Sequence, residues 1–293
     1  MKFKKHALLL LCCTALLTGC ESAEETSSSD SEVTITVSGT TRSIVSNGIP
    51  DHGLDEDTDY INELKEQTLT YEVTTEPSKN DDTTSYTEPQ KFGVAINGIP
   101  LDPFTAEYYK KDKSSGWHID ATGGNLGLDK YGAHIQRDGT YHYHSIKTDF
   151  FTAFGVTSST HSPLIGYAAD GFPVYAKYVY SDANDSSSAI TEVQSNYQLK
   201  SGTRPDGPGG TYDGTYVEDY EFIDGLNGDL NDANARYGVT PEYPEGTWYY
   251  VLTENFPFIP IKFLGDTDSS FSGGPSGRLF DFIHQSHSHT HPH

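Results

Sequence analysis

Cysteine is scarce in this sequence of 293 residues, and all three cysteines lie within the first 20 positions. Disulfides therefore cannot hold the remaining chain together, although they stabilise many exported domains. The chain has to rely on a hydrophobic core, on a bound metal ion, or on both. About 270 residues follow the cysteine-containing segment, which is enough to bury a core of ordinary size.

Positive charge is scarce as well. Lys and Arg together number 19, against 42 Asp and Glu, and the formal net charge is −23. Without residues 1–19, which hold three lysines and no acid, the net charge becomes −26. This excess of acid argues against nucleic acid and anionic lipid surfaces as partners, because both attract basic patches. Solubility alone explains the acidity equally well.

Long apolar runs are absent. The one candidate runs from Ala7 to Leu17, whereas a transmembrane helix needs about 20 apolar residues. Three lysines precede the run, and Leu17-Thr18-Gly19-Cys20 ends it in a pattern that resembles the bacterial lipobox. A charged start followed by a short apolar core is typical of a secretory signal peptide.

These features predict a lipoprotein. We expect residues 1–19 to be its signal peptide, and Cys20 to carry the fatty acids, palmitate among them, that anchor the protein in a lipid bilayer. Residues 20–32 are acidic and rich in Ser, which predicts a flexible tether. The folded part would then lie in the cell envelope, periplasmic or extracellular. The alternative is an ordinary signal peptide in which Cys20 occurs by chance.

The rest of the sequence predicts a mostly β fold. It is rich in Tyr (20), Phe (14), Gly (28) and Pro (15), and short aromatic and β-branched runs cut by Gly and Pro are typical of β proteins. We expect one domain over residues 33–265, a β-sandwich or an irregular barrel-like fold with long loops. Strands are expected at 33–37, 93–96, 140–144, 164–168, 174–180 and 247–253, short helices at 105–111 and 229–236, and polar loops at 75–90, 181–188 and 200–214.

A four-residue repeat is visible in this region. Asn47-Gly48-Ile49-Pro50 recurs as Asn97-Gly98-Ile99-Pro100. Asn-Gly followed by Pro favours tight turns. The two copies are consistent with a pair of related hairpins.

The stretch most suggestive of chemistry is Thr140-Tyr141-His142-Tyr143-His144, which follows the turn signal Asp138-Gly139. Side chains on a strand alternate between faces, so the two histidines point one way and the two tyrosines the other. Alternate residues lie roughly 6–7 Å apart, which lets both imidazoles reach one metal ion. The tyrosines would pack into the core behind them.

His134 lies before the same turn, and a short hairpin would bring it beside His142 and His144. Three neutral imidazoles suit zinc, copper, nickel or iron(II), and suit calcium or magnesium poorly. Copper and zinc are the metals we expect. His161, His52 or a carboxylate such as Asp170 would complete the site. The alternative is a strand of hydrogen-bonded structural histidines.

On these residues the sequence resembles the YHYH-domain family, named after the motif at Tyr141–His144. The matching segments also include 46–52, 93–100, 133–136, 161–175, 237–246 and 256–260. The family has no assigned biochemical function, so the resemblance implies which residues matter and names no reaction. The family pattern carries over to His52, Asp129, His134, His142, His144, His161 and Asp170.

One departure from the family pattern concerns a disulfide. Relatives often have Cys within the stretch that corresponds to residues 231–235 and again near 261–263. This chain has Ala233 and Lys262 in those stretches. The disulfide that the resemblance implies for relatives is therefore absent here.

The last segment, residues 266–293, predicts a flexible tail. It is rich in Gly, Ser and Pro and ends in a cluster of histidines. Such a cluster can bind soft or borderline divalent metals weakly. The alternative is a residual expression tag. The clustered histidines are His284, His287, His289, His291 and His293.

Three functional classes remain open at this stage: a metal-binding lipoprotein, a metal-dependent enzyme of unknown substrate, and a structural or adhesion module without metal. A serine hydrolase is disfavoured, because the chain has no Gly-x-Ser-x-Gly motif to present a nucleophile. No protein partner is predicted.

Overall fold

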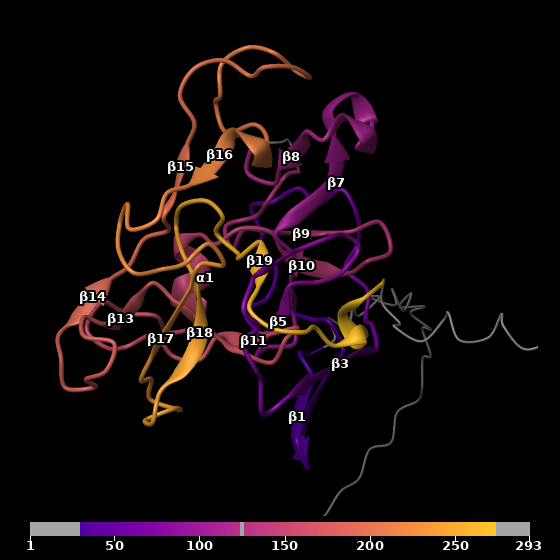
Figure 1. The fold of residues 1–293 in the computed structure, drawn as a ribbon. Helices are drawn as coiled ribbons and strands as arrows, with labels where there is room; N and C mark the ends of the chain where they lie inside the picture. The colour runs from indigo at the N-terminus through magenta and orange to yellow at the C-terminus, as the bar shows by residue number, and fades with distance from the viewer. Residues whose placement is uncertain (1–29, 124–125, 274–293) are drawn as a thin grey trace, which may run out of the picture.

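The computed structural model describes residues 30–123 and 126–273 (Figure 1). The expected signal peptide, the expected acylation site Cys20, most of the expected tether and the histidines of the tail lie outside the described residues. Within them, no helix has the length and the apolar character needed to cross a membrane.

The body of the molecule is built around an open sheet of eight strands, with the order β17-β18-β12-β11-β5-β6-β10-β9. Its pairs are antiparallel except β12 with β18 and β6 with β10. The sheet does not close into a barrel over the described residues, and the prediction of a β-rich, irregular fold is confirmed. The strands are β5 (Gly93–Ala95), β6 (Pro100–Leu101), β9 (Ala133–Ile135), β10 (Tyr141–Tyr143), β11 (Gly166–Ala168), β12 (Pro173–Ala176), β17 (Ala235–Gly238) and β18 (Thr247–Leu252).

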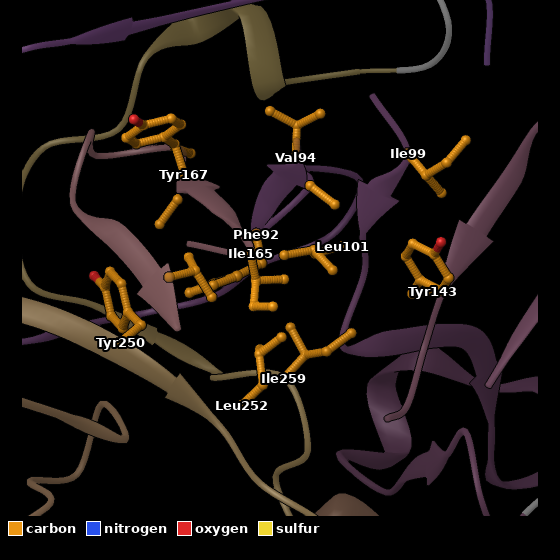
Figure 2. Packing of buried hydrophobic residues seen from close by; sticks show 14 of the residues in the cluster. Phe92, Val94, Ile99, Leu101, Tyr143, Ile165, Tyr167, Tyr250, Leu252 and Ile259 are labelled. Carbon is orange, nitrogen blue, oxygen red and sulfur yellow. The ribbon is translucent and has the colours of Figure 1, made fainter. Parts of the chain in front are cut away.

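The core lies against the middle of this sheet. Figure 2 shows the side chains of Phe92, Val94, Leu101, Ile165 and Leu252 gathered from several strands. All residues of β5, β10, β11 and β12 are buried. Strands buried on both faces lack the polar–apolar alternation of a half-exposed sheet. Aromatic rings fill much of the volume.

Smaller sheets and short helices surround the central sheet (Figure 1). A three-stranded sheet consists of β1 (Val33–Ser38), β2 (Thr41–Ser46) and β3 (Leu69–Thr74). The two-stranded sheets pair β4 (Thr84–Ser85) with β19 (Lys262–Phe263), β7 (Phe104–Tyr108) with β8 (His118–Asp120), β13 (Tyr178–Tyr180) with β14 (Ile190–Glu192), and β15 (Tyr197–Leu199) with β16 (Tyr220–Phe222). The helices are α1 (Thr148–Ala153) and the 3₁₀ turns η1 (Tyr109–Lys111), η2 (Lys113–Ser115), η3 (Val217–Asp219) and η4 (Ser269–Phe271).

The predicted helices are mostly wrong. Residues 105–111 form the end of β7 and the single turn η1. Residues 229–236 contain no helix, because the Asn231 side chain accepts hydrogen bonds from the backbone N–H groups of Ala233 and Ala235, each at 3.0 Å, and turns the chain into β17. Asn favours such local turns over helix. The one α-helix within residues 30–123 and 126–273, α1, was not predicted.

The Asn-Gly-Ile-Pro repeat forms two similar turns. The side-chain oxygen of Asn47 accepts the N–H of Ile49 at 3.2 Å, and that of Asn97 accepts the N–H of Ile99 at 3.3 Å. Only the second copy closes a hairpin, between β5 and β6, whereas the first ends β2. The two turns are packed together: a Cβ at Gly98, whose φ is +77°, would lie 2.3 Å from the Ser46 Oγ.

The segments that a disulfide would join in relatives lie side by side in this chain. The Lys262 Nζ lies 2.5 Å from the Asp232 Oδ2, and the Thr83 hydroxyl donates to the same oxygen at 2.9 Å. Each partner of this ion pair is partly exposed, so its contribution to stability is about 1 kcal/mol or less. An ion pair thus connects the two segments.

Candidate metal centre

A tight hairpin carries the three histidines that converge. The Gln136 N–H donates to the Thr140 carbonyl at 2.8 Å, and the Gly139 N–H returns to the Gln136 carbonyl at 2.9 Å. The Asp138 carboxylate accepts the Thr140 N–H at 3.0 Å. Gly139 has a φ of +94°, and a Cβ there would lie 2.6 Å from the Lys65 side chain. Only glycine fits this position without strain.

The hairpin register places His134 directly opposite His142 in the antiparallel pair β9–β10. His144 follows two residues later, on the same face. The three Nε2 atoms form a triangle, with 3.2 Å from His134 to His142, 2.9 Å from His142 to His144 and 3.2 Å from His144 to His134. Tetrahedral coordination with metal–nitrogen bonds of about 2.0–2.1 Å places the nitrogens about 3.3 Å apart. The triangle matches that spacing closely.

Burial keeps the three imidazoles neutral. His142 and His144 are 0% and 3% exposed, and His134 is partly exposed. Burial lowers the pKa of all three, that of His142 well below its usual value and that of His144 to about 4. The Nδ1 of His142 lies 3.3 Å from the Thr140 carbonyl oxygen, a contact that favours the tautomer with a free Nε2 lone pair. Neutral imidazoles with free Nε2 atoms are the form that binds metal.

Hydrogen bonds among the three rings cannot satisfy this arrangement. Each neutral Nε2 is either a donor or an acceptor. Among three atoms in mutual contact, at least two must have the same role, so at least one of the three contacts is donor against donor or acceptor against acceptor. A single cation at the centre would satisfy all three lone pairs together.

A largely buried ion pair lies next to the histidines. Strand β6 runs parallel to β10 with Leu101 opposite Tyr143, so the next residue, Asp102, follows the strand on the side of His144. Its N–H donates to the Tyr143 carbonyl at 2.8 Å, and its carboxylate pairs with the Lys91 ammonium. The Asp102 charge raises the pKa of His144, and the Lys91 charge lowers it. Sequence reasoning missed Asp102, whose only signal is a polar residue two positions after the second Asn-Gly-Ile-Pro turn.

The two tyrosines of the strand point away from the histidines and are fully buried, as predicted. The Tyr141 hydroxyl donates to the Asp129 carboxylate at 2.6 Å. The Tyr143 hydroxyl lies 2.7 Å from the Nε2 of His52 and accepts from the Asn97 amide at 3.0 Å. Strand β10 is therefore held from behind by satisfied polar contacts, which fix the direction in which its histidines point.

Three residues expected near the metal lie elsewhere. His52 is on the tyrosine side of the strand and stacks on Tyr131 with ring centroids 3.7 Å apart. His161 is buried among tyrosines, and its Nδ1 lies 2.9 Å from the Ser162 carbonyl oxygen. Asp170 accepts hydrogen bonds from the N–H groups of Leu264 and Gly265. Among the residues that the structure describes, only His134, His142 and His144 come together in this way.

These features define a β-rich protein with a three-histidine hairpin. The family model for YHYH protein matches residues 70–265, which is more than half of the chain and includes the whole hairpin. The chain belongs to the YHYH protein family. Comparisons with curated proteins and with solved structures gave no match.

Proposed function

We propose that this protein binds one divalent transition-metal ion through the Nε2 atoms of His134, His142 and His144. The observation that carries the proposal is the convergence of these three atoms at 2.9–3.2 Å. Imidazole ligands favour copper and zinc over calcium and magnesium. Copper or zinc is therefore the metal we assign to the site.

A place in the cell envelope completes the proposal. The lysines before Ala7–Leu17 and the lipobox-like end at Cys20 support an acylated lipoprotein. Its folded part would lie on the periplasmic or extracellular side of a membrane. A metal site there, with no cysteine among residues 21–293, would be insensitive to thiol oxidation. The protein would bind or hold metal at that surface.

A second candidate is a metal-dependent enzyme. Structural zinc sites are closed by four protein ligands, whereas catalytic sites have three and keep a position open for water or substrate. The cluster provides three ligands, and His134 is partly exposed while the other two are buried. The ligand number and the one exposed edge both favour an accessible fourth position. The structure names no substrate.

The test uses the full chain with Cys20→Ser and with all five tail histidines changed to Asn, so that neither lipid nor tail affects metal content. Elemental analysis after dialysis against copper or zinc should give one ion per chain. His142→Ala with His144→Ala in this background should give none. His161→Ala, a buried histidine outside the cluster, is the matched control and should retain the ion.

Two results would overturn the proposal. One is a background protein that holds no copper or zinc after dialysis. The other is a double variant that melts cooperatively and still holds one ion per chain.

A further inference from the structure

The three-stranded sheet has one covered edge and one free edge. At the β3 edge, the Ser270 hydroxyl accepts the Glu72 N–H at 2.9 Å and lies 3.3 Å from the Glu72 carbonyl oxygen, so η4 covers it. At the other edge, β1 pairs only with β2 among the described residues. It projects from the lower side of the body in Figure 1. A free edge presents unpaired N–H and C=O groups to another strand.

Strand β1 carries exposed apolar side chains. Ile35 is 42% exposed and Val37 is 59% exposed. Both lie on the face of the sheet that holds Ile44 and Tyr71, because Ile35 is opposite Ile44, which is opposite Tyr71. Ile44 and Tyr71 are buried against the body. The apolar face of the sheet therefore continues past the body and ends uncovered on β1.

The usual protections of an edge strand are missing. Proteins guard free edges with charged side chains, proline or β-bulges. Val33–Ser38 contains no charged residue and no proline, and its register with β2 runs without a shift. The chain as a whole has a net charge of −23, so an uncharged, regular, exposed strand stands out.

The sequence of this strand is palindromic. Val33-Thr34-Ile35-Thr36-Val37 reads the same in both directions. Antiparallel pairing of two copies about Ile35 would set Val33 against Val37, Thr34 against Thr36 and Ile35 against Ile35. Isologous two-fold interfaces require such self-complementarity.

We propose that two copies of this protein form a symmetric dimer by antiparallel pairing of their β1 strands, with the two-fold axis at Ile35. The product is a six-stranded sheet whose apolar face is continuous across the two copies. In this register Glu32 is opposite Ser38, and Asp30 is opposite Thr40, so no like charges oppose each other. The covered β3 edges stop further addition, so the assembly closes at two.

The first test is sedimentation equilibrium over a concentration series, on the full chain with Cys12, Cys13 and Cys20 all changed to Ser. This protein should show a monomer–dimer equilibrium. Ile35→Lys should abolish the dimer, because the two-fold axis places the two ammonium groups directly opposite. Val45→Lys is the matched control: Val45 is 39% exposed on the opposite face of the same sheet, at β2, and its variant should still dimerise.

A second test avoids any doubt about folding. Strand pairing places opposed Cα atoms about 4.5 or 5.5 Å apart, within the range of about 4.4–6.8 Å for disulfides. In the cysteine-free chain, Ile35→Cys should give a disulfide-linked dimer under mild oxidation. Ser201→Cys, in an exposed loop, should not.

The outcomes decide the proposal. The proposal is supported if Ile35→Lys loses the dimer while Val45→Lys keeps it, and if Ile35→Cys cross-links while Ser201→Cys does not. A monomer at every concentration would overturn it, as would a dimer that persists in Ile35→Lys. Failure of Ile35→Cys to cross-link more than Ser201→Cys would also overturn the assigned axis.

Discussion

The Nε2 atoms of His142 and His144 lie 2.9 Å apart, although one residue separates the two histidines along the extended chain. Backbone geometry alone separates such residues by roughly 6–7 Å. The two rings are therefore tilted toward a common point, which His134 also reaches from the opposite strand.

Metal binding should stabilise the fold. A ligand that binds only the folded state adds about 2.7 kcal/mol to the free energy of unfolding at one hundred times its dissociation constant. For a domain of this size that corresponds to a rise of about 5–10 °C in melting temperature. Thermal melts of the tail-substituted chain with and without zinc measure the rise. It should vanish in His142→Ala with His144→Ala; an equal rise in that variant would show that zinc acts at another site.

The metal-free protein should lose stability in mild acid. The pKa of His144 is about 4 in the folded protein and about 6.5 in an unfolded chain. Below about pH 6.5 the unfolded state therefore binds the additional proton, and the free energy of unfolding falls as the pH approaches 4. His144 alone accounts for about 3 kcal/mol of this loss.

Urea unfolding of the metal-free protein between pH 4 and 8 tests this prediction. Above about pH 6.5, the contribution of His144 to the free energy of unfolding should not change with pH. In His144→Gln the loss toward pH 4 should be smaller. A variant and parent with parallel pH profiles would contradict the buried, neutral state of His144.

The hairpin turn should matter for both stability and metal affinity. Gly139→Ala combines a φ of +94° with a clash against Lys65, whereas Gly155, with a φ of +69°, has nothing within 4 Å of its Cβ position. Backbone strain alone costs about 1–2 kcal/mol at either site. Gly139→Ala should cost more than Gly155→Ala and should also weaken zinc binding. Chemical unfolding and zinc titration, run on both variants, make the comparison, and equal effects would contradict the account.

The Tyr143 hydroxyl should stabilise the strand that carries the histidines. Tyr143→Phe leaves the His52 Nε2 and one Asn97 amide hydrogen without their partner, which costs about 1–3 kcal/mol. Tyr178 is only partly buried, and its hydroxyl makes no hydrogen bond among the described residues. Tyr178→Phe is therefore the control and should change the free energy of unfolding by less than about 0.5 kcal/mol. Urea unfolding measures both variants, and equal changes would show that the Tyr143 contacts add nothing.

Local pattern predicted the part of the site that lies within one hairpin. The turn at Asp138-Gly139 and the alternation of Tyr and His are short-range signals, and the structure bears both out. The β-rich character followed from composition in the same way. Helix α1 was missed because its six residues are too few to show a helical period.

The sequence did not predict which residues distant along the chain pack beside the histidines. Asp102 reaches the histidines through a parallel pair between β6 and β10, and no local pattern specifies which strands pair. His161 and Asp170 were predicted as further ligands because the family pattern includes them. The His161 ring instead lies among tyrosines, and the Asp170 carboxylate accepts backbone N–H groups elsewhere in the fold. His52 is close in space to the motif but lies behind it, on the tyrosine side.

The most direct test of the central claim is X-ray absorption at the metal edge, on the tail-substituted chain loaded with one equivalent of zinc. The account predicts three imidazole nitrogens at about 2.0–2.1 Å, and loss of imidazole scattering in His142→Ala with His144→Ala. A zinc spectrum with fewer than three imidazoles, or one unchanged by the two substitutions, would contradict it.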